Sequence, residues 1–139
     1  MNAFEKPPAD APKRILVIED EPDIRNFIAE YLQDQGYEVI TSMDGLDGLY
    51  QARTQSPDLV LLDVMLPKLN GFAICRLLKY DQNFHDIPVI LWSWKDEDKD
   101  LEEGKASGAD AYVPKPFSLP KLGEKIAELI FLRPVKKLS

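Results

Sequence analysis

Three carboxylates stand where apolar stretches of this sequence end. Glu19 and Asp20 directly follow the apolar run 15–18, and Asp63 lies near the end of the most hydrophobic stretch, 58–64. Carboxylates held close together raise one another's pKa, and a hard divalent cation removes that repulsion. Mg²⁺ typically binds one or two carboxylates together with waters and phosphate oxygens. We therefore predict a Mg²⁺ site awaiting a phosphoryl group, with one carboxylate acting as a nucleophile toward phosphorus.

A hydroxyl and an ammonium group follow two further apolar runs. Ser93 ends the run 87–93, and Lys115 comes just after the run 109–113. The Lys115 ammonium would neutralise charge on the transferring oxygens, as in other phosphoryl transfers. Alone, each is an ordinary surface side chain, so the prediction depends on a fold that places them beside the carboxylates.

The apolar pattern predicts five strands that alternate with five helices. The expected strands cover 15–18, 37–41, 58–64, 87–93 and 109–113. Such alternation indicates an α/β protein with a parallel sheet covered on both faces. Right-handed crossovers favour the open, doubly wound, flavodoxin-like (βα)5 sheet with strand order 2-1-3-4-5. In that order the first and third strands are neighbours about 4.8 Å apart, so their carboxylates should share one crevice.

The helices are expected to bury one face each. The inward positions are Ile24, Phe27, Ile28, Tyr31 and Leu32 in the first helix, Leu46, Leu49 and Tyr50 in the second, Phe72, Cys75 and Leu78 in the third, and Leu119, Leu122, Ile126, Leu129 and Ile130 in the last. Pro22, Asp44 and Ser118 suit helix starts, and Gly36 suits a helix end. The nearly all-charged segment 95–107 offers only Leu101 and Ala106 to a core and is predicted to be weakly held.

Four segments, in this order, resemble the receiver domain of two-component response regulators: ILVIEDE, LVLLDVMLPKLNG, PVILWSWKDE and GADAYVPKPF. The resemblance covers about residues 13–132. It implies a chemotaxis-regulator-like fold in a receiver domain at 14–132. The proline-containing segment 1–13 has no periodic pattern and is predicted to be a flexible leader, and 133–139 is predicted to be a C-terminal tail.

The resemblance also implies the metal ligands. Asp63 would be the phosphoacceptor, forming an aspartyl phosphate, and would bind Mg²⁺ together with Asp20 and the backbone carbonyl of Met65. Glu19 would act through a metal-bound water. Mg²⁺ is the only cofactor implied.

The remaining implied roles concern the phosphoryl group and a switch. Ser93 would hydrogen-bond the phosphoryl group and Lys115 would pair with it, with Pro116 following through a cis bond. Tyr112 would be an aromatic switch whose rotamer follows Ser93, although a plain half-buried strand aromatic would look the same in the sequence.

The chief departure from the family is Trp94, where a small residue is usual. It would either lean over the crevice rim or the path of Tyr112, or point outward and pack on 95–107. The neighbouring Trp92 replaces a usual aliphatic residue, which core filling explains.

The predicted function is that of a signalling receiver rather than an enzyme. It would take a phosphoryl group from a histidine kinase or phosphotransfer protein onto Asp63 and change a protein-binding surface on the fourth helix, fifth strand and fifth helix. It would catalyse only its own phosphorylation and dephosphorylation.

A Mg²⁺-dependent phosphatase of the haloacid dehalogenase type is one alternative, but Met65 stands where its general acid should be. An FMN-binding flavodoxin is another, although the acidic residues 19–23 would repel phosphate unless a metal were present.

Composition limits the partners and the compartment. A net charge of −7 argues against direct contact with nucleic acid. No apolar run approaches the ~20 residues of a membrane helix, and the N-terminus is no signal peptide. One cysteine, Cys75, permits no internal disulfide, which fits the cytoplasm. Many receivers dimerise through an acidic pair on the fifth strand. Here Asp110 precedes Ala111, and Leu101 replaces a common basic residue, so an unphosphorylated monomer is expected.

Overall fold

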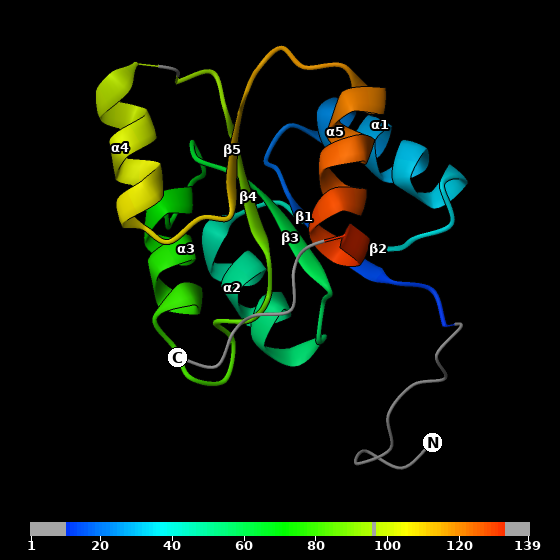
Figure 1. Cartoon of the computed structure of the whole chain (residues 1–139), viewed down its shortest axis with the longest axis horizontal. Helices are drawn as coiled ribbons and strands as arrows, with labels where there is room; N and C mark the ends of the chain where they lie inside the picture. Colours follow the sequence, from blue (N-terminus) through cyan, green and yellow to red (C-terminus); the bar gives the residue numbers. More distant parts are fainter. Residues whose placement is uncertain (1–10, 96, 133–139) are drawn as a thin grey trace.

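The computed structural model describes residues 11–95 and 97–132. Its parallel sheet has five strands in the order β2-β1-β3-β4-β5, as predicted (Figure 1). The strands are β1 (Arg14–Ile18), β2 (Glu38–Ser42), β3 (Leu59–Asp63), β4 (Val89–Ser93) and β5 (Ala111–Pro114). The helices are α1 (Pro22–Asp34), α2 (Gly45–Thr54), α3 (Gly71–Lys79), α4 (Asp98–Ala106) and α5 (Leu119–Ala127), with a π-helical turn at Glu128–Leu132. No helix among these residues is long and apolar enough to cross a membrane.

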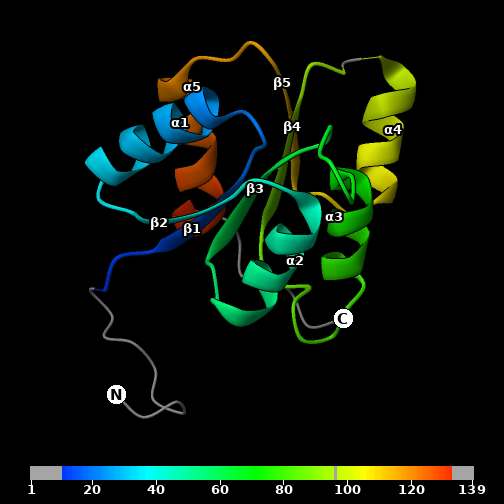
Figure 2. The same ribbon diagram turned by 180° about the vertical axis from the view of Figure 1, so that it is seen from behind.

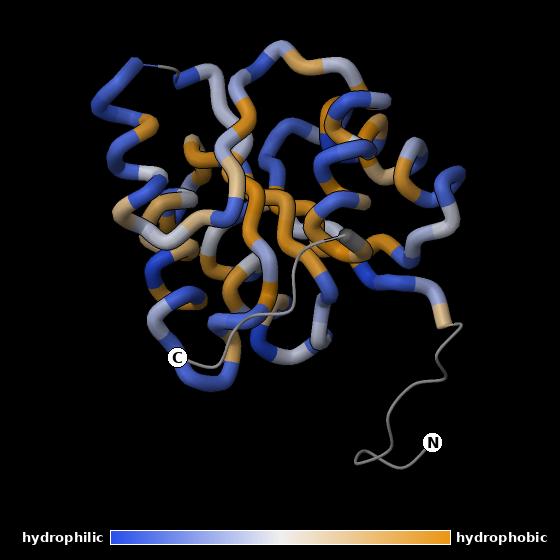
Figure 3. Tube along the Cα trace, viewed as in Figure 1, coloured by the Kyte–Doolittle hydropathy of each residue, from blue (hydrophilic) through white to orange (hydrophobic). Residues whose placement is uncertain are grey.

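The sheet separates two hydrophobic cores. Helices α1 and α5 cover one face, and α2, α3 and α4 lie on the other side (Figures 1 and 2). Figure 3 shows hydrophobic residues concentrated in the central strands, whereas α4 is largely hydrophilic. The strands in the middle are buried on both faces, which explains why β3 and β4 are continuous apolar runs rather than alternating ones.

Most of the predicted helix caps are present, whereas several strands begin or end at other residues than predicted. Asp44 and Ser118 accept the expected backbone hydrogen bonds at the starts of α2 and α5, and Gly36 follows α1 with φ +96°. Strand β4 begins at Val89, two residues later than predicted, because Pro88 has no N–H for the sheet. Residues 1–10 of the predicted leader and the whole predicted tail, 133–139, lie outside the described residues.

The predicted inward faces of α1 and α2 are partly wrong. The side chains of Phe27, Leu46 and Tyr50 are 64%, 56% and 62% exposed. In α2 the inward face is centred on Gly48, where an added Cβ would lie 2.6 Å from the side chain of Ile18. Because this helix approaches the sheet through glycine, Leu46 and Tyr50 turn away from the core, whereas the predicted Leu49 is buried in it.

The predicted inward face of α4 is also wrong, because this helix too packs through a glycine. Its buried residues are Asp100 and Gly104, not the predicted Leu101, which is half-buried, and Ala106, which is exposed. A Cβ at Gly104 would lie 2.7 Å from the ring of Tyr112, so the helix backbone rests almost directly on that ring. The Asp100 carboxylate accepts the Glu97 N–H in a capping box at the start of α4.

Candidate functional site

The carboxyl ends of β1 and β3 bring the three predicted carboxylates together. The two strands pair in register from Ile15–Leu59 to Ile18–Leu62, so Glu19 and Asp63 emerge side by side. Carboxylate oxygens of Glu19, Asp20 and Asp63 all lie within 4.8 Å of one another. Glu19 and Asp63 are buried, whereas Asp20 is exposed. The cluster therefore has a buried floor and one carboxylate at its mouth.

Lys115 lies inside this cluster. Its Nζ donates to Glu19 Oε1 at 2.9 Å and to Asp63 Oδ2 at 3.2 Å. The three side chains are only 4%, 4% and 7% exposed. The backbone N–H of Lys115 also donates to the Ser93 carbonyl at 2.7 Å, which ties the end of β5 to β4. The predicted cis bond between Lys115 and Pro116 is present.

One ammonium does not balance three carboxylates. Burial raises the pKa of Glu19, with Lys115 opposing this shift and Asp63 adding to it. Burial also raises the pKa of Asp20, with the Glu19 carboxylate adding to it. Ionised oxygens at this spacing are the ligands that Mg²⁺ prefers, and the residues present therefore fit that ion.

Backbone contacts hold the acidic loop after β1 in place. Arg25 on α1 donates from Nη1 to the carbonyls of Glu19 and Asp20, at 2.9 and 3.4 Å. The N–H of Met65 donates to Asp63 Oδ1 at 2.9 Å, so the predicted Met65 backbone does lie beside the Asp63 carboxylate. Sequence reasoning missed Arg25, since only the turn at residues 19–25 makes a guanidinium on the helix reach back to these carbonyls.

Ser93 and Tyr112 meet at the backbone of one residue. The buried Ser93 Oγ accepts the Lys95 N–H at 3.0 Å, and the Tyr112 hydroxyl donates to the Lys95 carbonyl. The half-buried Tyr112 ring also stacks on Phe72, with ring centroids 6.5 Å apart. Ser93 and the predicted switch residue Tyr112 are therefore linked through the loop between β4 and α4.

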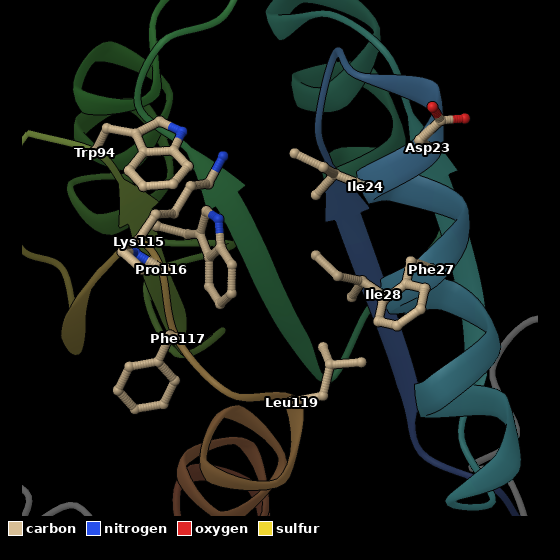
Figure 4. Close-up of a pocket in the computed structure, with 10 residues that line it drawn as sticks. Asp23, Ile24, Phe27, Ile28, Trp94, Lys115, Pro116, Phe117 and Leu119 are labelled. Atoms are coloured by element: carbon tan, nitrogen blue, oxygen red, sulfur yellow. The ribbon is translucent and has the colours of Figure 1, made fainter.

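A groove of about 380 Å³ opens beside Lys115 (Figure 4). Its lining residues are Asp23, Ile24, Phe27 and Ile28 of α1, Trp92 and Trp94 at the end of β4, and Lys115, Pro116, Phe117 and Leu119. Trp94, 61% exposed, lies next to Lys115 across the groove from α1. Trp94 also lines a second groove together with Glu97, Lys99 and Asp100, so it lies between the two positions considered for it. The groove explains why Phe27 is exposed, and it could not be predicted from the sequence, because two distant segments form its walls.

The receiver-domain profile of response regulators matches residues 15–127. The chain belongs to the response regulator receiver family. It is 39% identical over 118 residues to the alkaline phosphatase synthesis transcriptional regulatory protein PhoP of Bacillus subtilis, a match covering 85% of this chain and 48% of the relative. It is 38% identical over 117 residues to the DNA-binding dual master transcriptional regulator RpaA of Synechocystis, with 84% and 48% covered. The receiver thus spans about half the length of these relatives.

Solved structures agree with this assignment. The receiver superimposes on the chemotaxis protein CheY4 of Vibrio cholerae with a TM-score of 0.80, at 28% identity, covering 86% of this chain and 99% of the other. It also matches the receiver domain of a sensor histidine kinase from Pseudomonas aeruginosa, solved with a magnesium ion coordinated in the active site cleft. That match has a TM-score of 0.79 and 29% identity and covers 86% and 98% of the two chains. The receiver is therefore a signalling domain rather than a classical enzyme, and the phosphatase and FMN-flavodoxin alternatives are wrong.

Proposed function

We propose that this receiver accepts a phosphoryl group on Asp63 from a phosphohistidine of a kinase or phosphotransfer protein, in a reaction that requires Mg²⁺. The observation that carries the proposal is the cluster itself. Three carboxylates lie within 4.8 Å of one another, and the Lys115 ammonium is 3.2 Å from Asp63 Oδ2. Asp20, Asp63, the Met65 carbonyl and, through water, Glu19 would hold Mg²⁺, which neutralises charge on the phosphoryl oxygens.

The side chains of this chain then have separate tasks. A carboxylate oxygen of Asp63 forms the new O–P bond while the N–P bond of the donor breaks, and the donor imidazole leaves with the electron pair. Lys115 orients Asp63 through their hydrogen bond, and its ammonium pairs with a phosphoryl oxygen as charge develops there. Ser93 donates its hydroxyl to another phosphoryl oxygen.

The readout depends on the Lys95 backbone. A change of the Ser93 rotamer toward a phosphoryl group would move Oγ away from the Lys95 N–H and free the loop between β4 and α4. The same loop carries the carbonyl that holds the Tyr112 hydroxyl. Phosphorylation would therefore reposition Tyr112 and the α4–β5–α5 face, where a downstream protein would bind. A net charge of −7 supports a protein rather than nucleic acid as the direct partner, and the expected compartment is the cytoplasm.

The proposal is tested by intact-mass spectrometry after incubation with acetyl phosphate. The wild type is expected to gain one phosphoryl mass with Mg²⁺ and none with a chelator, and Asp63→Asn to gain none in either case. Asp23→Asn, which removes an exposed carboxylate in the first turn of α1, serves as the matched control and should behave as the wild type. An unchanged mass gain in Asp63→Asn would refute the assignment of the acceptor.

A further inference from the structure

The ammonium of Lys115 is held by carboxylates on one side and by an aromatic ring on another. We propose that Trp92 is a positioning residue that holds the Lys115 ammonium beside Asp63 through a cation–π contact. It thereby sets the rate at which Asp63 accepts a phosphoryl group. This inference rests on the function proposed above for Asp63 and Lys115.

The distances fit such a contact. Lys115 Nζ lies 5.7 Å from the centroid of the Trp92 ring, within the ~6 Å over which an ammonium is attracted to an aromatic face. Trp92 is 6% exposed and the Lys115 side chain 4%. Because both groups are buried, little water weakens the attraction, which then opposes movement of the ammonium away from Asp63.

Strand register explains why these residues meet. Asp63 pairs with Trp92, and Trp92 pairs with Val113. Residues paired in register point to the same face of a parallel sheet, and Lys115 follows Val113 by two positions. Asp63, Trp92 and Val113 therefore form a row across β3, β4 and β5 with Trp92 on the middle strand, and Lys115 follows just beyond the end of β5. Position 92 therefore lies on the same face of the sheet as Asp63, one strand away from the segment that carries Lys115.

The Trp92 ring also contacts a second residue, Phe117. Phe117 contacts Trp92 in an edge-to-face arrangement, with centroids 6.5 Å apart and planes at 74°. Lys115 and Phe117 flank Pro116, so one indole contacts both sides of the turn between β5 and α5. Trp92 can therefore fix the position of the turn as well as that of the ammonium.

The indole N–H argues against simple core filling. Trp92 Nε1 is buried and has no hydrogen-bond partner within the described part of the chain. A buried donor without a partner is destabilising, and an aliphatic core residue would avoid this cost. The ring face, which is the strongest cation binder among the aromatic side chains, is the property that Leu lacks.

The test compares Trp92→Phe, which keeps an aromatic face, with Trp92→Leu, which does not. Ile90→Val trims the same face of β4 without contacting Lys115 and controls for loss of core packing. With acetyl phosphate and Mg²⁺, Trp92→Leu should be phosphorylated about three- to tenfold more slowly than the wild type. Trp92→Phe should recover most of the rate, and Ile90→Val should stay at the wild-type rate.

Two further measurements show whether Trp92 acts through Lys115. In a Lys115→Gln background, Trp92→Leu should cause no additional slowing. In proton NMR spectra, the ε-methylene resonances of Lys115 should show the upfield ring-current shift in the wild type and in Trp92→Phe, and lose it in Trp92→Leu. The ring-current shift can be measured without phosphorylation. The wild-type spectrum alone tests the contact, even if Trp92→Leu does not fold.

The outcomes separate the two claims. A wild type that gains no phosphoryl group would refute the proposed function and, with it, the rate effect assigned to Trp92. A wild type that is phosphorylated normally while Trp92→Leu keeps its rate within twofold, or slows equally in the Lys115→Gln background, would refute the role of Trp92 alone. Absence of the ring-current shift in the wild type would refute the contact itself.

Discussion

At the scale of single residues, the ammonium of Lys115 is shared between two buried carboxylates. It donates to Glu19 at 2.9 Å and to Asp63 at 3.2 Å, while Asp20 lies at the exposed mouth of the cluster. Without a cation, the cluster carries more negative than positive charge. The metal-free protein should therefore gain stability when one of these charges is removed.

This repulsion predicts the behaviour of Asp20→Asn. Because burial raises the pKa of Asp20, the folded state binds its proton more tightly than the unfolded state does. The stability that this proton gives is complete below the ordinary value of 3.8 and is lost as the pH rises through the raised pKa. In a chelator at neutral pH, Asp20→Asn should melt at a higher temperature than the wild type and bind Mg²⁺ more weakly. The difference in melting temperature should shrink as the pH falls toward 3.8.

The control is Asp23→Asn, which removes the same charge from outside the cluster. It should leave Mg²⁺ affinity unchanged. A lower melting temperature for Asp20→Asn, combined with unchanged Mg²⁺ affinity, would show that Asp20 takes no part in the cluster.

Trp94 predicts a second effect at this scale. The indole lies at the rim of the groove that leads to Lys115, so it should restrict the access of donors and of water to Asp63. Trp94→Ala should speed both phosphorylation by acetyl phosphate and hydrolysis of the aspartyl phosphate. It should also reduce the change in tryptophan fluorescence on adding beryllofluoride, although Trp92 remains. Trp94→Phe, which keeps much of the bulk, should lie between the two. Rates within about twofold of the wild type, less than ~0.5 kcal/mol of barrier, would mean that Trp94 is no gate.

At the scale of the elements, α4 depends on a glycine for its position. Gly104 faces the Tyr112 ring, which is itself held by Phe72 and by its hydroxyl bond to Lys95. The helix offers little apolar surface of its own. Its packing therefore depends on the orientation of Tyr112, and a change in Tyr112 should move α4.

Gly104→Ala is the direct test of this packing. Alanine favours a helix over glycine by about 1 kcal/mol. The new Cβ would nevertheless lie 2.7 Å from the Tyr112 ring, and such overpacking typically costs ~1–3 kcal/mol. We expect a net loss of stability in urea denaturation and a changed Tyr112 environment in near-ultraviolet circular dichroism. The matched control is Gly123→Ala on α5, where the new Cβ is 3.2 Å from the end of the Tyr31 side chain. Equal stability changes in the two variants would contradict the tight contact between α4 and Tyr112.

Helix faces are also where sequence reasoning failed. It predicted that Leu46 and Tyr50 would be buried, because apolar side chains at helical spacing usually face a core. Glycine carries no hydrophobic signal, so the close approach of Gly48 to Ile18 and of Gly104 to Tyr112 could not be read from the pattern. These contacts appear only once helix and sheet are packed together.

At the scale of the whole molecule, the sequence predicted the fold and the cluster for one common reason. Each apolar run specifies a strand, and parallel strands place the residues at their carboxyl ends along a single edge of the sheet. Glu19, Asp63 and Lys115 could therefore be placed together without coordinates. The contact between Lys115 and Trp92 could not, since it depends on the register of three strands and on the turn at Pro116.

We expect a monomer in the unphosphorylated state. The Asp110 carboxylate accepts from Lys79 Nζ and from the Val89 N–H, each at 2.8 Å. It is therefore engaged within its own chain, and the following Ala111 offers no charge for a partner. Light scattering at micromolar concentration should give the mass of one chain, and a stable dimer would contradict this. Repeating the measurement with Mg²⁺ and beryllofluoride shows whether activation changes the assembly.

The role of Asp63 as phosphoacceptor is best tested by locating the acyl phosphate itself. The protein is phosphorylated with acetyl phosphate and Mg²⁺ and reduced with borohydride, which converts an aspartyl phosphate to homoserine, and its peptides are then sequenced by mass spectrometry. We predict homoserine at position 63 alone, and none when Mg²⁺ is chelated before the donor is added. Homoserine at position 20, or the corresponding reduced alcohol at Glu19, would contradict the proposed role. Equal modification of Asp63 without Mg²⁺ would contradict it as well.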